Sequence, residues 1–146
     1  MTTVSDIMTR GVRTLAPTDP VRRAAQSMDE LNVGSIPVCD GKKLVGMVTD
    51  RDITLRGVAA GLDLEATPLS DIMSKDVQWC YEDQALAEVM ATMAESQIRR
   101  LPVVNRDKHL VGIFSLGDIA TKTDSSTVAS VLQDISEPAG SEATSA

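Results

Sequence analysis

Aromatic residues are nearly absent from this sequence, which has one Trp, one Tyr and one Phe among 146 residues. Val, Ile, Leu, Met and Ala must therefore fill any hydrophobic core. No apolar run approaches the roughly 20 residues of a membrane-spanning helix, and the start MTTVSDIMTRG lacks the basic and apolar regions of a signal peptide. We therefore expect a soluble, cytoplasmic protein with no membrane partner.

Cysteine and histidine are also scarce. Cys39 and Cys80 form no CxxC pattern, and His109 is the only histidine, so the chain has too few soft ligands for a dedicated zinc site. We expect both cysteines to be buried, reduced thiols that pack as small apolar groups. A disulfide between them remains geometrically possible. The sequence predicts no metal site.

Basic residues are fewer than acidic ones: the chain has 14 Lys and Arg and 21 Asp and Glu, which gives a net charge of −7. This balance disfavours generic binding to nucleic acid or to anionic lipid. The length suffices for one compact domain with a proper core.

One ten-residue stretch occurs twice. LVGMVTDRDI at residues 44–53 returns as LVGIFSLGDI at residues 110–119. Each copy is a short apolar run, which indicates a buried strand, followed by the start of a helix. A hydroxyl residue and, three positions later, an aspartate therefore lie at a strand-to-helix turn. These are Thr49 and Asp52 in the first copy, and Ser115 and Asp118 in the second.

Two interpretations of this turn stay open. In the first it is a capping box, in which the hydroxyl caps the helix and the aspartate accepts from the cap's N–H, although aspartate reaches back less well than the usual Glu or Gln. In the second it is a nucleotide site, in which helix N–H groups attract a phosphate and the carboxylate accepts from ribose hydroxyls. The hydroxyl can cap the helix and still face a ligand.

The repetition extends upstream. Ser-Asp-Ile-Met at residues 5–8 returns 65 residues later at 70–73. Asp19-Pro20 predicts a helix start with Asp19 as N-cap. Apolar residues then follow at helical spacing, namely Val21, Ala24, Ala25, Met28 and Leu31 in the first copy and Leu86, Val89, Met90 and Met93 in the second. A proline-containing strand and a hairpin turn lead into the repeated stretch. Each copy thus predicts an opening strand, a helix, two strands and a helix.

These segments define the expected organisation. The first repeat spans residues 4–56, and a linker with two glycines and a closing proline spans 57–68. The second repeat spans 69–122. Residues 123–146 are expected to hold a short amphipathic helix, marked by Val128, Val131, Leu132 and Ile135, and a disordered tail.

The order of motifs in residues 4–122 resembles a tandem pair of cystathionine-β-synthase (CBS) domains of the stand-alone type. In each copy these motifs are DIM, a helix, GSIPV or RRLPV, and then LVG followed by two apolar residues and [ST]-x-x-D. The resemblance implies an α/β (α+β) fold of two β-α-β-β-α repeats related by a pseudo-twofold axis. It also implies two clefts that bind AMP, ADP, ATP or S-adenosylmethionine.

The resemblance further implies which residues bind. The loop before the proline strand often faces the turn of the opposite copy, so Thr49 and Asp52 would share a cleft with Arg99, Arg100 and Leu101, and Ser115 and Asp118 with Gly34, Ser35 and Ile36. Arg99, Arg100 and Arg51 supply cations for phosphates in the first cleft. The second cleft suits a ligand with less phosphate, or it binds no ligand. The alternative for Arg99 and Arg100 is a solvated or ion-paired role.

No nucleophile lies next to a base, so no catalytic residue is predicted and the chain is not expected to be an enzyme. The leading hypothesis is a regulatory energy-sensing module with no obligatory cofactor. An adenosine ligand would shift the arrangement of a homodimer, or act through an unknown effector protein. The alternative is a stress-associated scaffold with vestigial ligand sites.

Overall fold

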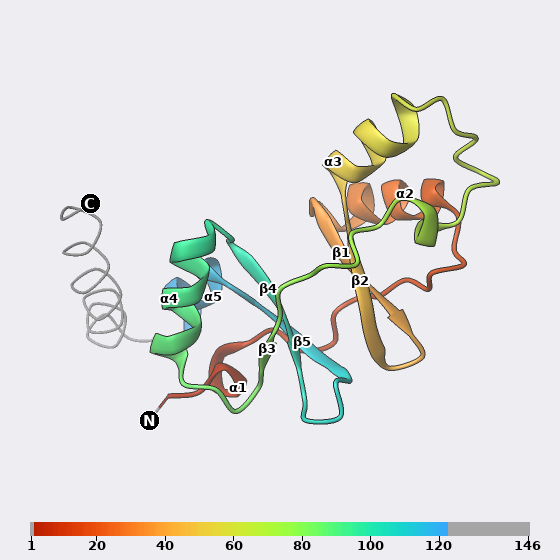
Figure 1. Ribbon diagram of the computed structural model, residues 1–146. Helices are drawn as coiled ribbons and strands as arrows, with labels where there is room; N and C mark the ends of the chain where they lie inside the picture. The colour runs from red at the N-terminus through yellow and green to blue at the C-terminus, as the bar shows by residue number, and fades with distance from the viewer. Residues whose placement is uncertain (1, 123–146) are drawn as a thin grey trace. The chain divides into compact units, whose positions relative to one another are not determined.

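The computed structural model describes residues 2–122, and the expected short helix and tail at 123–146 lie outside this range. The chain divides into two compact units (Figure 1). One, here the 13–77 unit, holds Arg13–Val77 with Lys108–Leu110. The other, here the 78–122 unit, holds residues 2–12, Gln78–Asp107 and residues 111–122. Among the described residues no helix is long and apolar enough to cross a membrane.

The units do not follow the sequence repeats. The Asp-Ile-Met segment of the first repeat belongs to the 78–122 unit, and that of the second repeat belongs to the 13–77 unit. The two repeats have therefore exchanged their opening segments. Each unit is built from the helices and hairpin of one repeat and the opening segment of the other.

In the 13–77 unit a hairpin carries two helical segments (Figure 1). Strands β1 (Ser35–Asp40) and β2 (Lys43–Thr49) pair antiparallel. Helix α2 (Val21–Leu31) and the continuous pair α3 (Asp50–Asp52) and η1 (Ile53–Val58, a π-helix) pack on it, and η2 (Leu69–Asp71) follows. The apolar face of α2 joins both strands in one core, which includes Val21, Ala24, Met28, Ile36, Val38, Val48 and Ile53. The predicted helix face is confirmed, except that Leu31 is exposed.

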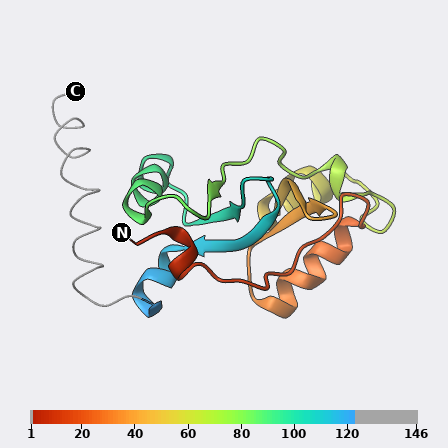
Figure 2. The same ribbon diagram turned by 90° about the horizontal axis from the view of Figure 1, so that it is seen from below.

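The 78–122 unit repeats this plan. Its sheet has the order β3 (Cys80–Tyr81), β4 (Arg100–Val104) and β5 (Leu110–Ser115), with α4 (Leu86–Ser96) between β3 and β4. Figure 2 shows α1 (Val4–Ile7) beside β5 and α5 (Leu116–Lys122). The four apolar residues predicted on α4 are all buried, together with Leu101, Val103 and Phe114.

The opening strand predicted at the Asp-Ile-Met segments is wrong. These residues form helical turns, α1 in the first copy and η2 in the second. In α1 the Asp6 carboxylate accepts from the Thr3 N–H at 2.9 Å, a capping box that favours a helical turn. The first strand of the β-α-β-β-α order instead comes later, as β3 in one unit and as a single parallel bridge from Leu15 to Val38 in the other.

The predicted helix cap at Asp19 is also wrong. Pro20 is the N-cap of α2, and the Asp19 carboxylate instead accepts from the Ala16 N–H at 2.8 Å. The first N–H groups of α2, from Val21 and Arg22, donate to the carbonyls of Thr67 and Leu64. The linker therefore does the capping that the sequence assigned to a side chain.

Both cysteines are buried free thiols, as expected. Burial raises the pKa of the Cys39 thiol, and it raises the pKa of Cys80 to about 12. Both groups are therefore protonated and weakly nucleophilic at neutral pH.

A candidate ligand site at each strand-to-helix turn

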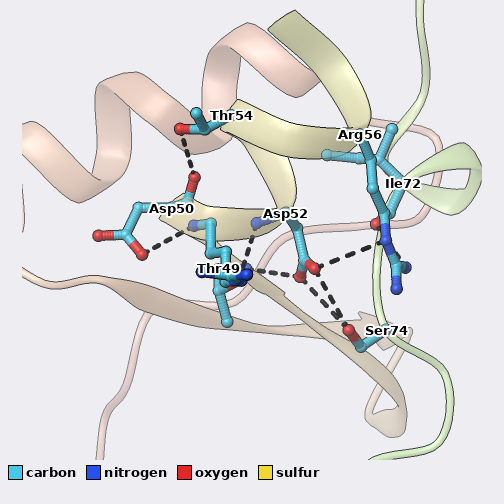
Figure 3. A network of polar contacts seen from close by, with 8 residues as sticks. Thr49, Asp50, Asp52, Thr54, Arg56, Ile72 and Ser74 are labelled. Atoms are coloured by element: carbon cyan, nitrogen blue, oxygen red, sulfur yellow. Dashed lines mark hydrogen bonds and ion pairs between the residues drawn. The ribbon is translucent and has the colours of Figure 1, made fainter. Parts of the chain in front are cut away.

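The turn that ends β2 is a capping box (Figure 3). The Asp52 N–H donates to the Thr49 hydroxyl at 3.0 Å, and the Thr49 N–H donates to the Asp52 carboxylate at 3.0 Å. Thr49 is half-buried, whereas Asp52 is only 9% exposed. The geometry of the first interpretation is therefore present, and the short aspartate side chain does reach back.

Two further side chains meet Asp52 (Figure 3). Ser74, from the opening segment of the second repeat, donates to both carboxylate oxygens at 3.4 and 3.5 Å. Arg56 on η1 places its Nε 4.0 Å from Asp52 Oδ1 and donates to the Ile72 carbonyl at 3.3 Å. An ionised carboxylate has about four acceptor positions. One short bond and two long ones leave Asp52 able to accept from further donors.

The turn that ends β5 has the same plan, with shorter contacts to the carboxylate. The Ser115 N–H donates to Asp118 at 2.9 Å, and the Ser115 hydroxyl exchanges bonds with the same residue. Thr9, from the opening segment of the first repeat, donates to Asp118 Oδ1 at 2.9 Å. Asp118 is 8% exposed. Its carboxylate is therefore closer to saturation than that of Asp52.

The loops before the proline strands lie beside the turns of their own hairpins. Ser35 is opposite Thr49 in the register of β1 and β2, and the Asp50 N–H donates to the Gly34 carbonyl at 3.0 Å. In the other unit the Leu116 N–H donates to the Arg99 carbonyl at 3.2 Å. Hairpin pairing thus brings loop and turn together within each copy. The pairing of each turn with the loop of the opposite copy stays a prediction.

The candidate residues differ in what they can offer a ligand. Arg51, Arg99 and Arg100 are exposed, so their guanidinium groups are accessible. Ile36 and Leu101 are 1% and 2% exposed and belong to the cores of their units, so only their backbone groups are suited to meet a ligand.

Sequence reasoning missed Thr9, Ser74 and Arg56. The signal for the first two is present, because the residue after each Asp-Ile-Met is a hydroxyl residue in both copies. The repeat period indicates that Thr9 and Ser74 are equivalent, but it does not indicate to which aspartate each hydroxyl donates a hydrogen bond. Arg56 has no such signal, since its role depends on the π-helical path of η1, in which the Ala59 N–H reaches back to the Thr54 carbonyl.

Comparison with known proteins finds the same family in both repeats. The family model for the CBS domain matches residues 4–57 and 69–124. The CBS domain-containing protein YhcV of Bacillus subtilis is 44% identical over 120 residues, which cover 82% of this chain and 84% of YhcV.

Solved structures show the same fold. Hypoxic Response Protein I with two coordinated zinc ions has a TM-score of 0.76 and 36% identity, and the match covers 84% of this chain and all of that one. In the part of this chain that the structure describes, no group of three His, Cys, Asp or Glu could hold a metal ion.

Two similar structures contain adenosine compounds. The CBS domain protein PAE2072 from Pyrobaculum aerophilum, complexed with AMP, has a TM-score of 0.74 and 25% identity, with 90% of this chain and 99% of that one covered. The CBS domain pair of MJ0100, in complex with 5-methylthioadenosine and S-adenosyl-L-methionine, has a TM-score of 0.70 and 28% identity, with coverage of 82% and 98%.

Proposed function

Since this chain belongs to the CBS domain family, we propose that it is a non-enzymatic regulatory module that binds adenosine nucleotides or derivatives at its two hydroxyl-x-x-aspartate turns. AMP, ADP, ATP and S-adenosylmethionine are the candidate ligands. Binding changes the conformation of a homodimer or the affinity for an effector protein. The protein acts in the cytoplasm and needs no obligatory cofactor.

The observation that carries the proposal is the Asp52 carboxylate. It is held at a fixed position by the Thr49 N–H, and its two long bonds from the single Ser74 hydroxyl can be replaced by stronger donors of a ligand. The vicinal hydroxyls of a ribose are two such donors, and the helix start beside them favours an anion. AMP in the PAE2072 structure, and methylthioadenosine and S-adenosylmethionine in the MJ0100 structure, support the ligand class.

The two turns favour different ligands. The turn at Asp52 carries the exposed Arg51, and Arg56 lies 4.0 Å from its carboxylate, so cations are available for a phosphate. Arg99 and Arg100 would add to them if the loop of the second copy faces this turn. At the other turn Gly117 replaces Arg51, and Asp118 already accepts three hydrogen bonds. We therefore propose that the Asp52 site binds the more highly phosphorylated ligand.

The homodimer is supported by an exposed apolar strip on η1. Leu55 and Val58 are 50% and 59% exposed, and burial of such side chains favours association. Leu55→Glu should convert a dimer to monomers in light scattering. A wild-type chain that is already monomeric at micromolar concentration would remove the dimer from the proposal.

A thermal-shift series tests the ligand. The purified protein is heated with AMP, ADP, ATP, S-adenosylmethionine or NAD, and GTP serves as the control. Ligand at a hundred times its dissociation constant adds about 2.7 kcal/mol, which raises the melting temperature by several degrees. A shift with an adenosine compound and none with GTP is expected, and calorimetry with Asp52→Ala then assigns it to the site.

The alternative is a scaffold or interaction protein whose turns serve only as helix caps. The complete capping boxes at both turns favour it, because each aspartate already has an intramolecular role. Unchanged melting curves with all five ligands would select this alternative. Partner proteins would then be the next search.

A further inference from the structure

The 13–77 unit has a hollow on its surface, between one face of α2 and the segment before that helix. Its volume is about 480 Å³, within the usual range of pockets for small molecules. Four residues of the lining lie at helical spacing on α2 and three belong to the preceding segment: Arg23, Gln26, Ser27 and Glu30, and Arg13, Thr14 and Leu15. No residue of the hydroxyl-x-x-aspartate turn contributes to the lining.

Ser27 is the unusual member of this lining. It is 5% exposed, yet its hydroxyl makes no side-chain hydrogen bond to any residue of the described range 2–122. Thr92, the equivalent residue of α4, instead bonds to the Glu88 carbonyl of its own helix at 3.2 Å. No side-chain oxygen of the described residues is both fully buried and without a hydrogen-bond partner, so the Ser27 hydroxyl itself remains accessible. Because Ser27 lines the hollow, this hydroxyl is available to a ligand there.

The repeat shows that the fold does not require this hollow. In the 78–122 unit the residues equivalent to Thr14, Arg23 and Gln26 are Trp79, Glu88 and Ala91. The equivalence is structural as well, since the parallel pairing of Leu15 with Val38 matches that of Cys80 with Val103. The same architecture thus forms with a bulky indole and an acidic side chain in these places.

Charge in the hollow favours an anion. Two arginines and one glutamate line it, which gives a local net charge of +1 in a chain of net charge −7. Arg13 neutralises Glu30 at 2.9 Å. Arg23 has only a long contact of 3.8 Å to Asp19, whose other oxygen already accepts from Ala16. The guanidinium of Arg23 is therefore the available cation.

We propose that this hollow is a second ligand site, separate from the hydroxyl-x-x-aspartate turns, that binds a small organic anion. A carboxylate or phosphate group of the ligand is held by the Arg23 guanidinium, the Gln26 amide and the Ser27 hydroxyl. These three side chains stand at positions i, i+3 and i+4 of one helix, so they face the same ligand.

The test follows backbone amide signals of the full chain by NMR during titration with citrate and, separately, with inorganic phosphate. Sodium chloride at matched ionic strength is the baseline. We expect saturable shifts at the amides of residues 13–15 and 23–30. A response to citrate alone identifies a carboxylate ligand, and a response to phosphate alone identifies a phosphate ester. Absence of saturable shifts with both probes overturns the proposal.

Two variants and a matched control sharpen the result. Arg23→Gln and Ser27→Ala should abolish the shifts, whereas Arg22→Gln, which changes an arginine outside this lining, should retain them. Ser27→Ala should also raise the melting temperature, because alanine favours helix more than serine does. A more stable protein that no longer binds separates a site from a structural role. Shifts that persist in both variants contradict the proposal.

The experiment also separates this site from the proposed function. Asp52→Ala should leave the citrate or phosphate shifts at residues 13–15 unchanged, and Ser27→Ala should leave the adenosine response unchanged. Failure of one site therefore does not imply failure of the other.

Discussion

The Thr9 hydroxyl donates a 2.9 Å hydrogen bond to the Asp118 carboxylate, although 109 residues separate them in the chain. The same relationship links Ser74 to Asp52, at 3.4 and 3.5 Å. Each turn is thus completed by a hydroxyl from the opening segment of the other repeat. A ligand that changes the position of Asp52 would act directly on the segment that begins the second repeat.

The difference in length between these contacts predicts a difference in stability. Thr9→Val removes a short bond to a buried carboxylate, so we expect a loss of about 1.5 kcal/mol in the free energy of unfolding. Ser74→Ala removes only long bonds, and we expect about 0.5 kcal/mol. Urea denaturation of both variants measures the two values. Equal losses would show that the two turns are held with equal strength.

Asp52→Ala tests both interpretations of the turn in one variant. The capping box should make the change cost about 0.5–2 kcal/mol of stability, and loss of the ribose acceptor should abolish binding of an adenosine ligand. Asp6→Ala is the matched control, because Thr3 and Asp6 form another capping box at a place where no ligand is expected. Asp6→Ala should reduce stability and leave affinity unchanged. Full affinity in Asp52→Ala would leave Asp52 with a capping role only.

The sequence predicted those features that depend on residues close together in the chain. The hairpins and the turn at Thr49 to Asp52 follow from patterns between residues that are close together in the chain. The contact of Thr9 with Asp118 could not be predicted, because a repeat period identifies equivalent residues and not their partners. The helical turn at Val4–Ile7 was missed because a four-residue segment is too short for periodicity to distinguish helix from strand.

Two glycines allow the opening segments to cross the strands, and their substitution should disrupt both units. A Cβ at Gly46 would lie 2.8 Å from the Ser74 carbonyl oxygen, and one at Gly112 would lie 2.7 Å from that of Thr9. Since these neighbours are backbone atoms paired to the strands, we expect Gly46→Ala and Gly112→Ala each to lose about 1–3 kcal/mol.

The control for these variants is Gly117→Ala. A Cβ at Gly117 would meet only the Ser115 hydroxyl, at 3.6 Å, and the residue lies in α5. Alanine should therefore stabilise the helix by up to about 1 kcal/mol. Urea denaturation distinguishes the opposite signs. Loss of stability in all three variants would indicate a general intolerance of side chains at glycine positions, and not the crossing of the opening segments.

Burial of Cys80 predicts that stability falls at alkaline pH. Its pKa rises from 9.0 to about 12 in the folded protein. Above pH 9 the unfolded chain therefore loses the thiol proton while the folded chain keeps it, so the free energy of unfolding decreases as pH rises between these two values. The slope for one thiol approaches about 1.4 kcal/mol per pH unit. In urea denaturation across this range, the free energy of unfolding of Cys80→Ala should decline less steeply with pH than that of the wild type. The reason is that the folded and unfolded states of the variant no longer differ in proton binding at this position. Identical slopes would mean that the Cys80 thiol ionises in the folded protein much as it does in the unfolded chain.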